Sequence, residues 1–182
     1  MTIIILILVV VLILVYVLTT YNKMVRLRNQ TEESAASIDA HLKQRYDLIP
    51  NLVEVVKGYA KHESETLTAV IEARNKAVSA TNLVDKNEAS NAFSTTLKSL
   101  FALSESYPDL KANANFLDLQ KELQNIERQL LQIRKYYNAV VKEFNTLTET
   151  IPSSLVAKIG KFSKQPYLEI EEEARQNVKV SF

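Results

Sequence analysis

Two histidines are the residues of this chain that most readily suggest chemistry. His62-Glu63 matches the start of the zinc-protease helix motif, which needs a second histidine four residues after the first so that both imidazoles reach one metal ion. Position 66 is Thr66, so the motif is incomplete. His41 is the other histidine, and no partner pattern surrounds it. We therefore expect neither histidine to bind a metal or to act as an acid or base.

Two aspartates form the next candidate site. Asp39 and Asp47 lie eight residues apart, near Lys43 and Arg45. They could work as a paired acid and base, but a solvated face with local ion pairs explains them at least as well. The chain also lacks the Glu-x-x-His repeats of di-iron bundles, a phosphate loop, a glycine-rich dinucleotide turn and a serine elbow. The sequence thus predicts no catalytic, cofactor-binding or metal site, and no enzyme.

Arg28 and Arg45 fall at positions of a helical seam where apolar residues are expected. A buried arginine needs a carboxylate or carbonyl partner. We expect both side chains to lie at the rim of the fold and to extend their guanidinium groups to water. The alternative is that they set helix register or receive an acidic partner segment.

Four asparagines also repeat at heptad spacing, namely Asn22 with Asn29 and Asn138 with Asn145. Polar residues beside a seam can specify which helices pair, so we expect hydrogen bonds between helices. A ligand groove is the alternative interpretation.

Composition limits the elements that could position these residues. Two glycines and four prolines in 182 residues supply too few turns for a sandwich or barrel, so the fold class is predicted to be all-α. A formal charge of +1 provides no electrostatic footprint for nucleic acid. The absence of cysteine excludes disulfides, thiolate zinc sites and a cysteine nucleophile.

An apolar run covers residues 3–18, and the first charged side chain is Lys23. With its flanks, the segment 1–22 has about the 20 residues that a transmembrane helix needs, so the lipid bilayer is the first expected partner. The flanks lack the features of a cleaved signal peptide, so we expect an uncleaved single-pass anchor. Lys23, Arg26 and Arg28 follow the run, and the positive-inside rule places the rest of the chain in the cytoplasm, at the inner cell membrane.

Two long seams with alternating spacings of three and four residues predict long helices packed as in coiled coils. The second seam comprises Phe116, Leu119, Leu123, Ile126, Leu130, Ile133, Tyr137, Val140, Phe144, Leu147 and Ile151. The first seam comprises Tyr21, Met24, Arg28, Thr31, Ala35, Ile38, Leu42, Arg45, Ile49, Leu52, Val56 and Tyr59. The first predicts that the anchor continues into the soluble part without a hinge, bends before Pro50 and ends near Gly58.

Shorter patterns predict two helices between the seams. One has the stripe Leu67, Val70, Ile71, Arg74, Ala77 and Val78, and the other has the stripe Ala89, Phe93, Leu97, Leu100 and Phe101. Asp85 with Glu88 is predicted to cap the second, and Tyr107-Pro108-Asp109 breaks the pattern after it. We expect about four long helices in an antiparallel up-and-down bundle over residues 23–152.

Residues 153–182 are predicted to be a short helix followed by an extended tail. Ser153 or Ser154 can cap the helix, and Gly160 can end it. Phe162 and Pro166-Tyr167 are expected to lie as a strap across the bundle. The acidic residues Glu169, Glu171, Glu172 and Glu173 are expected to be solvated. The alternating Val178, Val180 and Phe182 lie either extended against the bundle or disordered.

The residues that carry these seams also carry a family resemblance. The motifs are YNKMVRLRN (21–29), IDAHLKQRYDLIPNLVEVVKGYAKHE (38–63), EARNKA (72–77), YPDLKAN (107–113), NF (115–116), RKYYNAVVKEFNT (134–146) and IPSSLVAKIG (151–160). In this order and spacing they resemble the LemA family from residue 21 to about residue 167.

The resemblance implies a bacterial-type membrane protein with a short external N-terminus, one membrane helix and a cytoplasmic helical domain, without an established enzymatic activity. The chain departs from the family pattern at Ser37, Gln44, Lys161 and Leu168. Aromatic residues are more typical at three of these positions and a basic residue at the position of Gln44. Any partner surface that depends on those aromatics is therefore in doubt.

Three functions remain as expectations. The first is a membrane-tethered scaffold that binds another membrane or membrane-proximal protein. The second is a structural protein that self-assembles as a homo-oligomer at the membrane. The third is a hydrolase or metal enzyme whose site no motif reveals, and the scarcity of ligating groups argues against it.

Overall fold

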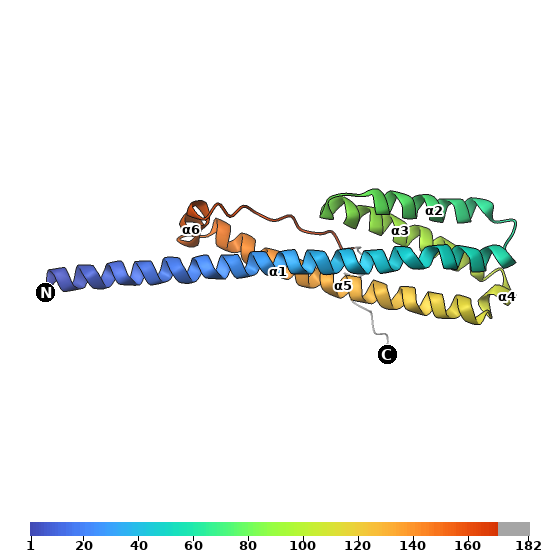
Figure 1. Cartoon of the computed structure of the whole chain (residues 1–182), viewed down its shortest axis with the longest axis horizontal. Coiled ribbons are helices and arrows are strands. Elements are labelled where there is room, and N and C mark those ends of the chain that lie inside the picture. The colour runs from blue at the N-terminus through green and yellow to red at the C-terminus, as the bar shows by residue number, and fades with distance from the viewer. Residues whose placement is uncertain (171–182) are drawn as a thin grey trace, which may run out of the picture. The chain divides into compact units, whose positions relative to one another are not determined.

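The computed structural model describes residues 1–170, and over that range every regular element is a helix (Figure 1). The helices are α1 (Thr2–Tyr59), α2 (Ser64–Ser79), α3 (Leu83–Ser104), α4 (Pro108–Lys111), α5 (Ala114–Glu149) and α6 (Ser153–Ile159). The all-α prediction is therefore confirmed. The predicted contents of residues 171–182, including the last three acidic residues and the alternating apolar tail, lie outside the described range.

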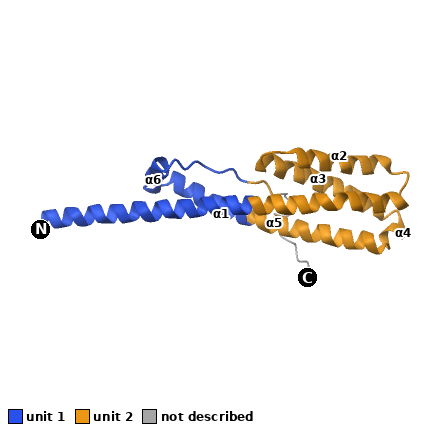
Figure 2. Cartoon of the chain, viewed as in Figure 1, with its two compact units in different colours: residues 1–35, 136–167 blue, residues 36–135, 168–182 orange. Residues whose placement is uncertain are grey.

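The chain divides into two compact units, and α1 and α5 contribute residues to both (Figure 2). Unit 1 contains residues 1–35 and 136–167. Unit 2 contains residues 36–135 and the segment that begins at Leu168.

Helix α1 contains a segment that is long and apolar enough to cross a membrane, as the sequence predicts. Residues 1–16 are all exposed. Packing on α1 begins at Val17, which is half-buried, and continues at Thr20 and Met24, whose exposed fractions are 8% and 0%. The helix then continues to Tyr59, one residue past the predicted end, with Pro50 inside it.

The core of unit 1 joins α1, α5 and α6. Met24 and Leu27 of α1 pack with Val140 and Phe144 of α5 and with Ala157 of α6. Leu147 and Phe162 cover this cluster from its edge. Met24 of the first seam and Val140 and Phe144 of the second are thus buried here because each faces the other helices of its own unit, whereas Tyr21 and Arg28 of the first seam are exposed.

A tight turn after α6 returns the chain to α1. The Phe162 amide donates to the Ala157 carbonyl at 2.9 Å, and the Lys161 amide donates to the Lys158 carbonyl at 3.3 Å. These two bonds define a Schellman motif. Its left-handed residue is Lys161, with φ of 54°, while Gly160 is the C-cap. The predicted stop at Gly160 is correct, but a close approach and not φ requires the glycine.

That close approach involves two aromatic rings. A Cβ on Gly160 would lie 2.5 Å from Phe162 Cε2 and 3.1 Å from Tyr21 Cε2. Phe162 also packs edge-on against Phe144, with centroids 6.0 Å apart. The predicted strap follows, because the Tyr137 hydroxyl donates to the Pro166 carbonyl at 3.1 Å.

Unit 2 contains the hairpin of α2 and α3, which lie side by side in Figure 1. Both predicted stripes face inward at Leu67, Val70 and Ala77 and at Phe93, Leu97 and Leu100. Ile71 and Val78 are exposed, so the α2 stripe is narrower than predicted.

Two predicted helix caps are wrong. The side chain that caps α3 is Asn82, whose Oδ1 accepts from the Asp85 amide at 2.9 Å, so Asp85 lies in the first turn and does not open the helix. Neither Ser153 nor Ser154 caps α6, since Pro152 is at the N-cap and the Ser153 hydroxyl donates to the Thr150 carbonyl. In both cases the hydrogen bond at the start of the helix involves a residue of the preceding turn, which is Asn82 for α3 and Thr150 for α6.

The close contact at Gly160 leads to a prediction about stability. Gly160→Ala should lower the free energy of unfolding by about 1–3 kcal/mol, because Phe162 must leave its place between Tyr21 and Phe144. Denaturant unfolding of the full chain in detergent measures this change. Gly58→Ala is the matched control, since nothing lies within 4 Å of its new Cβ and alanine favours a helix by about 0.5–1 kcal/mol. Equal effects of the two substitutions would contradict the packing described here.

Candidate functional site

The largest fully buried side chain of the described residues is Arg45, in the unit 2 part of α1. Its Nη2 atom forms an ion pair with Glu127 of α5 and donates to the Ser94 hydroxyl of α3 at 2.8 Å. Its Nη1 atom donates to the Ser90 hydroxyl at 2.9 Å. One guanidinium group therefore joins three helices.

A second arginine completes this cluster. Arg134, seven residues after Glu127 on α5, is 6% exposed. It donates to the Ser90 hydroxyl at 3.0 Å and to Asn91 Oδ1 at 3.1 Å. We call Arg45, Ser90, Ser94, Glu127 and Arg134 the Arg45 cluster.

Aromatic rings cover the cluster on its apolar side. The Arg45 guanidinium carbon lies 4.8 Å from the centroid of the Phe93 ring, a cation–π contact. Tyr46 packs edge-on against the same ring, with centroids 5.6 Å apart. Burial raises the pKa of the Tyr46 phenol, and the nearby Ser90 hydroxyl and the Arg45 charge oppose this rise.

The expectation that Arg45 reaches water at the rim is wrong. Its exposed fraction is 0%, and the alternative of an acidic partner is met by Glu127 within the chain. Arg28 does follow the expectation, since it is exposed, lies 3.9 Å from Glu32 and stands over the Phe162 ring at 5.7 Å. The two arginines differ because α3 and α5 surround Arg45 with hydroxyls and a carboxylate.

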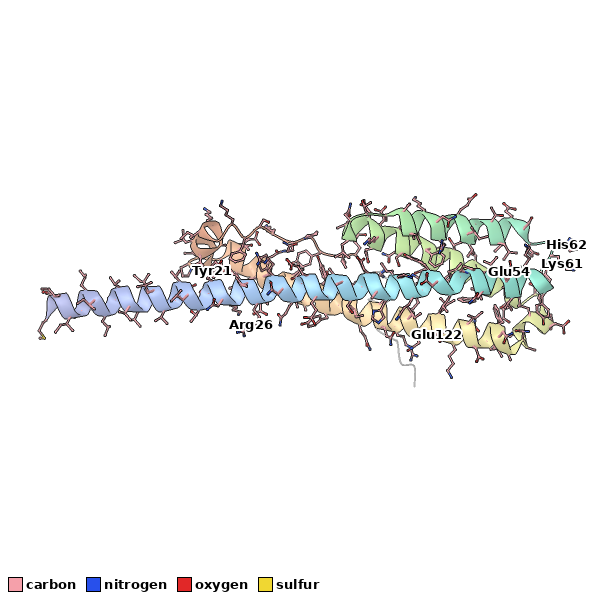
Figure 3. The ribbon with its side chains drawn as sticks, in the orientation of Figure 1. Tyr21, Arg26, Glu54, Lys61, His62 and Glu122 are labelled. Carbon is pink, nitrogen blue, oxygen red and sulfur yellow. The ribbon has the colours of Figure 1, made fainter. Side chains whose placement is uncertain are left out.

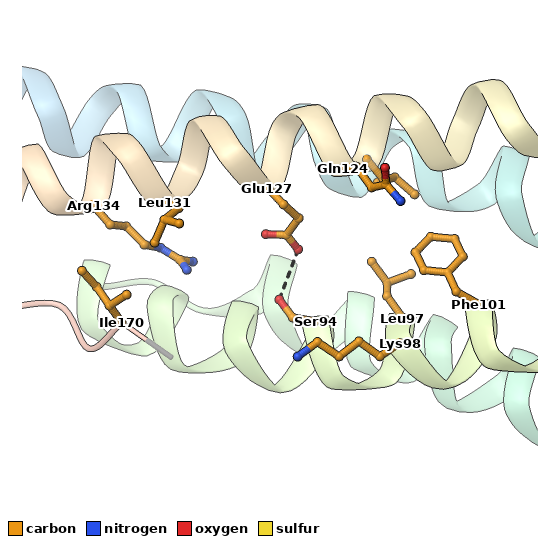
Figure 4. Close-up of a pocket in the computed structure, with 10 residues that line it drawn as sticks. Ser94, Leu97, Lys98, Phe101, Gln124, Glu127, Leu131, Arg134 and Ile170 are labelled. Atoms are coloured by element: carbon orange, nitrogen blue, oxygen red, sulfur yellow. Dashed lines mark hydrogen bonds between the residues drawn. The ribbon is translucent and has the colours of Figure 1, made fainter. Parts of the chain in front are cut away.

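A groove borders the Arg45 cluster between α3 and α5 (Figure 4). Its volume is about 460 Å³. It is lined by Ser94, Leu97, Lys98, Phe101, Leu123, Gln124, Glu127, Leu131, Arg134 and Ile170. We call it the α3–α5 groove. Its floor is apolar, and charged groups of both signs stand along it.

The polar groups of this groove are held by contacts within the protein. The Glu127 carboxylate, which would be its natural base, is held by Arg45 and by the Ser94 hydroxyl 3.2 Å away. Its lining contains no histidine, and residues 1–170 contain no group of three metal-ligating side chains. The groove can bind an apolar group and orient a charged one.

The two candidate histidines lie in separate parts of unit 2. His62 is exposed in the turn between α1 and α2, where Figure 3 shows it at the end of the helix. His41 Nδ1 lies 2.8 Å from the Ser37 carbonyl oxygen. Glu63 accepts from the Tyr107 hydroxyl at 3.0 Å, which is the main reason for the raised pKa of Tyr107.

The aspartates form separate ion pairs. Asp47 pairs with Lys43 at 2.5 Å within α1, as expected of a solvated face. Asp39 pairs with Lys86 of α3 at 2.7 Å, a contact between helices that local spacing does not show. Both aspartates line one pocket of about 300 Å³, and each is held there by its own lysine.

Among the asparagines, Asn145 is buried and both accepts from and donates to the backbone of Gln165, at 2.9 Å each. Its partner is therefore the strap and not another helix. Asn22 and Asn29 are exposed. At Asn145 the predicted hydrogen bond to another helix is thus replaced by hydrogen bonds to the extended segment.

Sequence reasoning missed Glu127, Arg134, Ser90 and Ser94. A signal was present, since Glu127 and Arg134 are seven residues apart and Ser90 and Ser94 are four apart, so each pair shares one helix face. An arginine in an otherwise apolar seam requires such a face opposite it.

The Arg45 cluster predicts a large effect of removing its carboxylate. Glu127→Ala should lower the free energy of unfolding by about 2–4 kcal/mol, because Arg45 would stay buried without its counter-charge. This range allows for the partial exposure of Glu127, 36%. Glu122→Ala, on the exposed face of the same helix, should change stability by less than about 0.5 kcal/mol. The double variant Arg45→Met/Glu127→Leu should recover most of the loss, and simple additivity in denaturant unfolding would contradict the pairing.

The raised pKa of Tyr46 predicts that the free energy of unfolding falls at alkaline pH. Its folded pKa lies above that of an unfolded tyrosine, about 10, so above pH 10 the folded state holds a proton that the unfolded chain releases. The stabilisation is complete below pH 10 and is lost as the pH rises through the folded pKa. Tyr46→Phe should therefore flatten the fall of the unfolding free energy above pH 10. Parallel pH profiles of parent and variant would contradict this assignment.

Comparison with known proteins shows the family of the chain. The LemA family model matches residues 34–182. A curated relative, Protein LemA of Metamycoplasma hominis, is 26% identical over 141 residues, which cover 75% of this chain and 63% of the relative. The chain thus matches less than two thirds of the length of that relative. The family match covers the second seam, the first seam from Ala35 onward and the Arg45 cluster, and the chain belongs to the LemA family.

Proposed function

We propose that this chain is a membrane-anchored interaction module, which is tethered by the first part of α1 and binds another membrane or membrane-proximal protein. The observation that carries the proposal is that α1 is one helix from an apolar segment of membrane-spanning length into both helical units. A helix keeps its backbone hydrogen bonds within itself and so can continue from lipid into water.

The α3–α5 groove is the surface we propose for the partner. It combines an apolar floor at Leu97, Phe101 and Leu131 with the charged rim of Lys98 and Glu127. Such a surface suits a segment that carries both apolar and charged side chains. The ion pair at Glu127 supports a binding role over catalysis, because it holds the carboxylate as a counter-ion.

Two finer features belong to the same proposal. We infer that the long helices form the antiparallel up-and-down bundle, since the Arg45 cluster links α1, α3 and α5, and α2 pairs with α3. We also infer that the helical units are cytoplasmic, at the inner cell membrane, because Lys23 and Arg26 follow the apolar segment.

Photo-crosslinking in native membranes tests the proposal. A photoreactive phenylalanine analogue at Gln124, an exposed residue in the lining of the α3–α5 groove, should give one discrete product with a different protein. The same analogue at Gln129, an exposed residue of α5 outside the groove, should not give it. The chain should also stay with the membranes after alkaline extraction.

Each other outcome rejects part of the proposal. Products that contain only copies of this chain would favour self-assembly instead. Equal products at Gln124 and Gln129 would reject the groove as the partner surface. Release of the chain by alkaline extraction would reject the anchor.

A further inference from the structure

Unit 1 carries an exposed apolar ridge on and just before α6. Leu155 and Ile159 are spaced by four residues and so share one face of α6, and Ile151 lies in the turn that precedes the helix. Their exposed fractions are 85%, 58% and 79%. The opposite side of α6 packs into the core of unit 1 through Ala157, so the ridge faces away from the protein.

Contacts within unit 1 place this ridge beside the end of the apolar segment of α1. The ideal Cβ position on Gly160 lies 3.1 Å from the Tyr21 ring, and the Tyr21 and Phe162 rings are 5.5 Å apart. Figure 2 shows α6 next to α1 within this unit. Tyr21 follows about 20 apolar or uncharged residues, which as a helix extend roughly 30 Å, the thickness of the hydrocarbon core. Tyr21 therefore belongs at the membrane–water boundary.

The burial of residues on α1 supports the same position for the membrane–water boundary. Val17 is half-buried and Thr20 is 8% exposed, whereas residues 1–16 are exposed. The folded part of unit 1 thus begins to cover α1 before the first charged residue, Lys23. Residues at the level of Tyr21 therefore lie against the lipid headgroups if α1 spans the bilayer as proposed.

We propose that the ridge of Ile151, Leu155 and Ile159 inserts into the interfacial layer of the bilayer that α1 spans. The inference rests on the proposed anchor and adds a second, peripheral contact with lipid. A ridge that lies at this depth removes its apolar surface from water without another protein. Lys158 and Lys161, both exposed, flank Ile159 and can reach lipid phosphates.

The bilayer is favoured over a protein partner by two observations. The ridge is continuous with the apolar segment through the contacts of Gly160 and Phe162 with Tyr21, so the membrane is already present at that level. The charges that flank Ile159 are basic, which suits an anionic leaflet, and Glu149 near Ile151 is paired with Lys164. Insertion of the ridge would fix the depth of unit 1 in the bilayer and its rotation about the axis of α1.

The absence of cysteine makes the test direct. The full chain is reconstituted in vesicles of phosphatidylcholine and phosphatidylglycerol, with a nitroxide label on one introduced cysteine. The variants are Ile159→Cys on the ridge, Val10→Cys in the apolar segment and Val78→Cys on α2, an exposed apolar residue of unit 2. Oxygen, which partitions into lipid, and a water-soluble nickel complex then report the surroundings of each label.

The expected result is that the Ile159 label resembles the Val10 label, with oxygen collisions several-fold more frequent relative to nickel than at Val78. A Val10 label in lipid with an Ile159 label in water would overturn this inference and leave the anchor intact. An Ile159 label shielded from both agents would also overturn it, because a protein would then cover the ridge. A Val10 label in water would overturn the anchor and the inference together.

Discussion

The buried guanidinium of Arg45 is the constraint on which unit 2 depends. Its charge is removed from water, so it needs a counter-charge and a hydrogen-bond acceptor for its donors. Glu127 supplies the charge, and the Ser90 and Ser94 hydroxyls supply acceptors. Each partner must stand opposite position 45, and this requirement sets the register of α3 and α5 against α1.

The same constraint explains polar residues that a purely apolar core would not contain. Ser90 is fully buried and accepts from both Arg45 and Arg134. A leucine there would leave donors of both arginines without this acceptor. Phe93, one turn further on, provides the face of its ring to Arg45 while its edges remain in the apolar core. Charge and apolar packing are therefore satisfied by one stretch of α3.

Sequence reasoning succeeded where periodicity alone decides the structure. From Phe116 to Leu147 every residue of the second seam is buried or half-buried, because a sustained alternation of three and four residues keeps one helix face toward its neighbours. It failed where an interaction depends on another helix. Spacing within α1 cannot distinguish Arg45 in the core from Arg28 at the surface, since the difference lies in the side chains of α3 and α5 opposite each.

Local motifs were predicted with mixed success for a related reason. The sequence predicts Gly160 as the end of α6, yet the role of this glycine is to admit the Phe162 and Tyr21 rings, and Tyr21 comes from a distant part of the chain. Asn82 was missed as the cap of α3 because Asp85 and Glu88 offered a similar pattern three residues later. Caps and turns depend on a single hydrogen bond, so a shift of one turn changes little in the sequence pattern.

The distribution of charged and apolar groups supports the proposal that this protein binds a partner at the membrane. In unit 2 the most buried charge, Arg45, is paired with Glu127, so the energy of this pair goes into fixing helix register. In unit 1 the exposed apolar ridge adjoins Tyr21, at the end of the exposed apolar segment of α1. A catalytic site would need the reverse arrangement, with a titratable group left unpaired in a cleft where its pKa could be tuned. The α3–α5 groove instead presents a carboxylate that is held by Arg45 and by the Ser94 hydroxyl, and a carboxylate fixed in this way can orient a partner by its position.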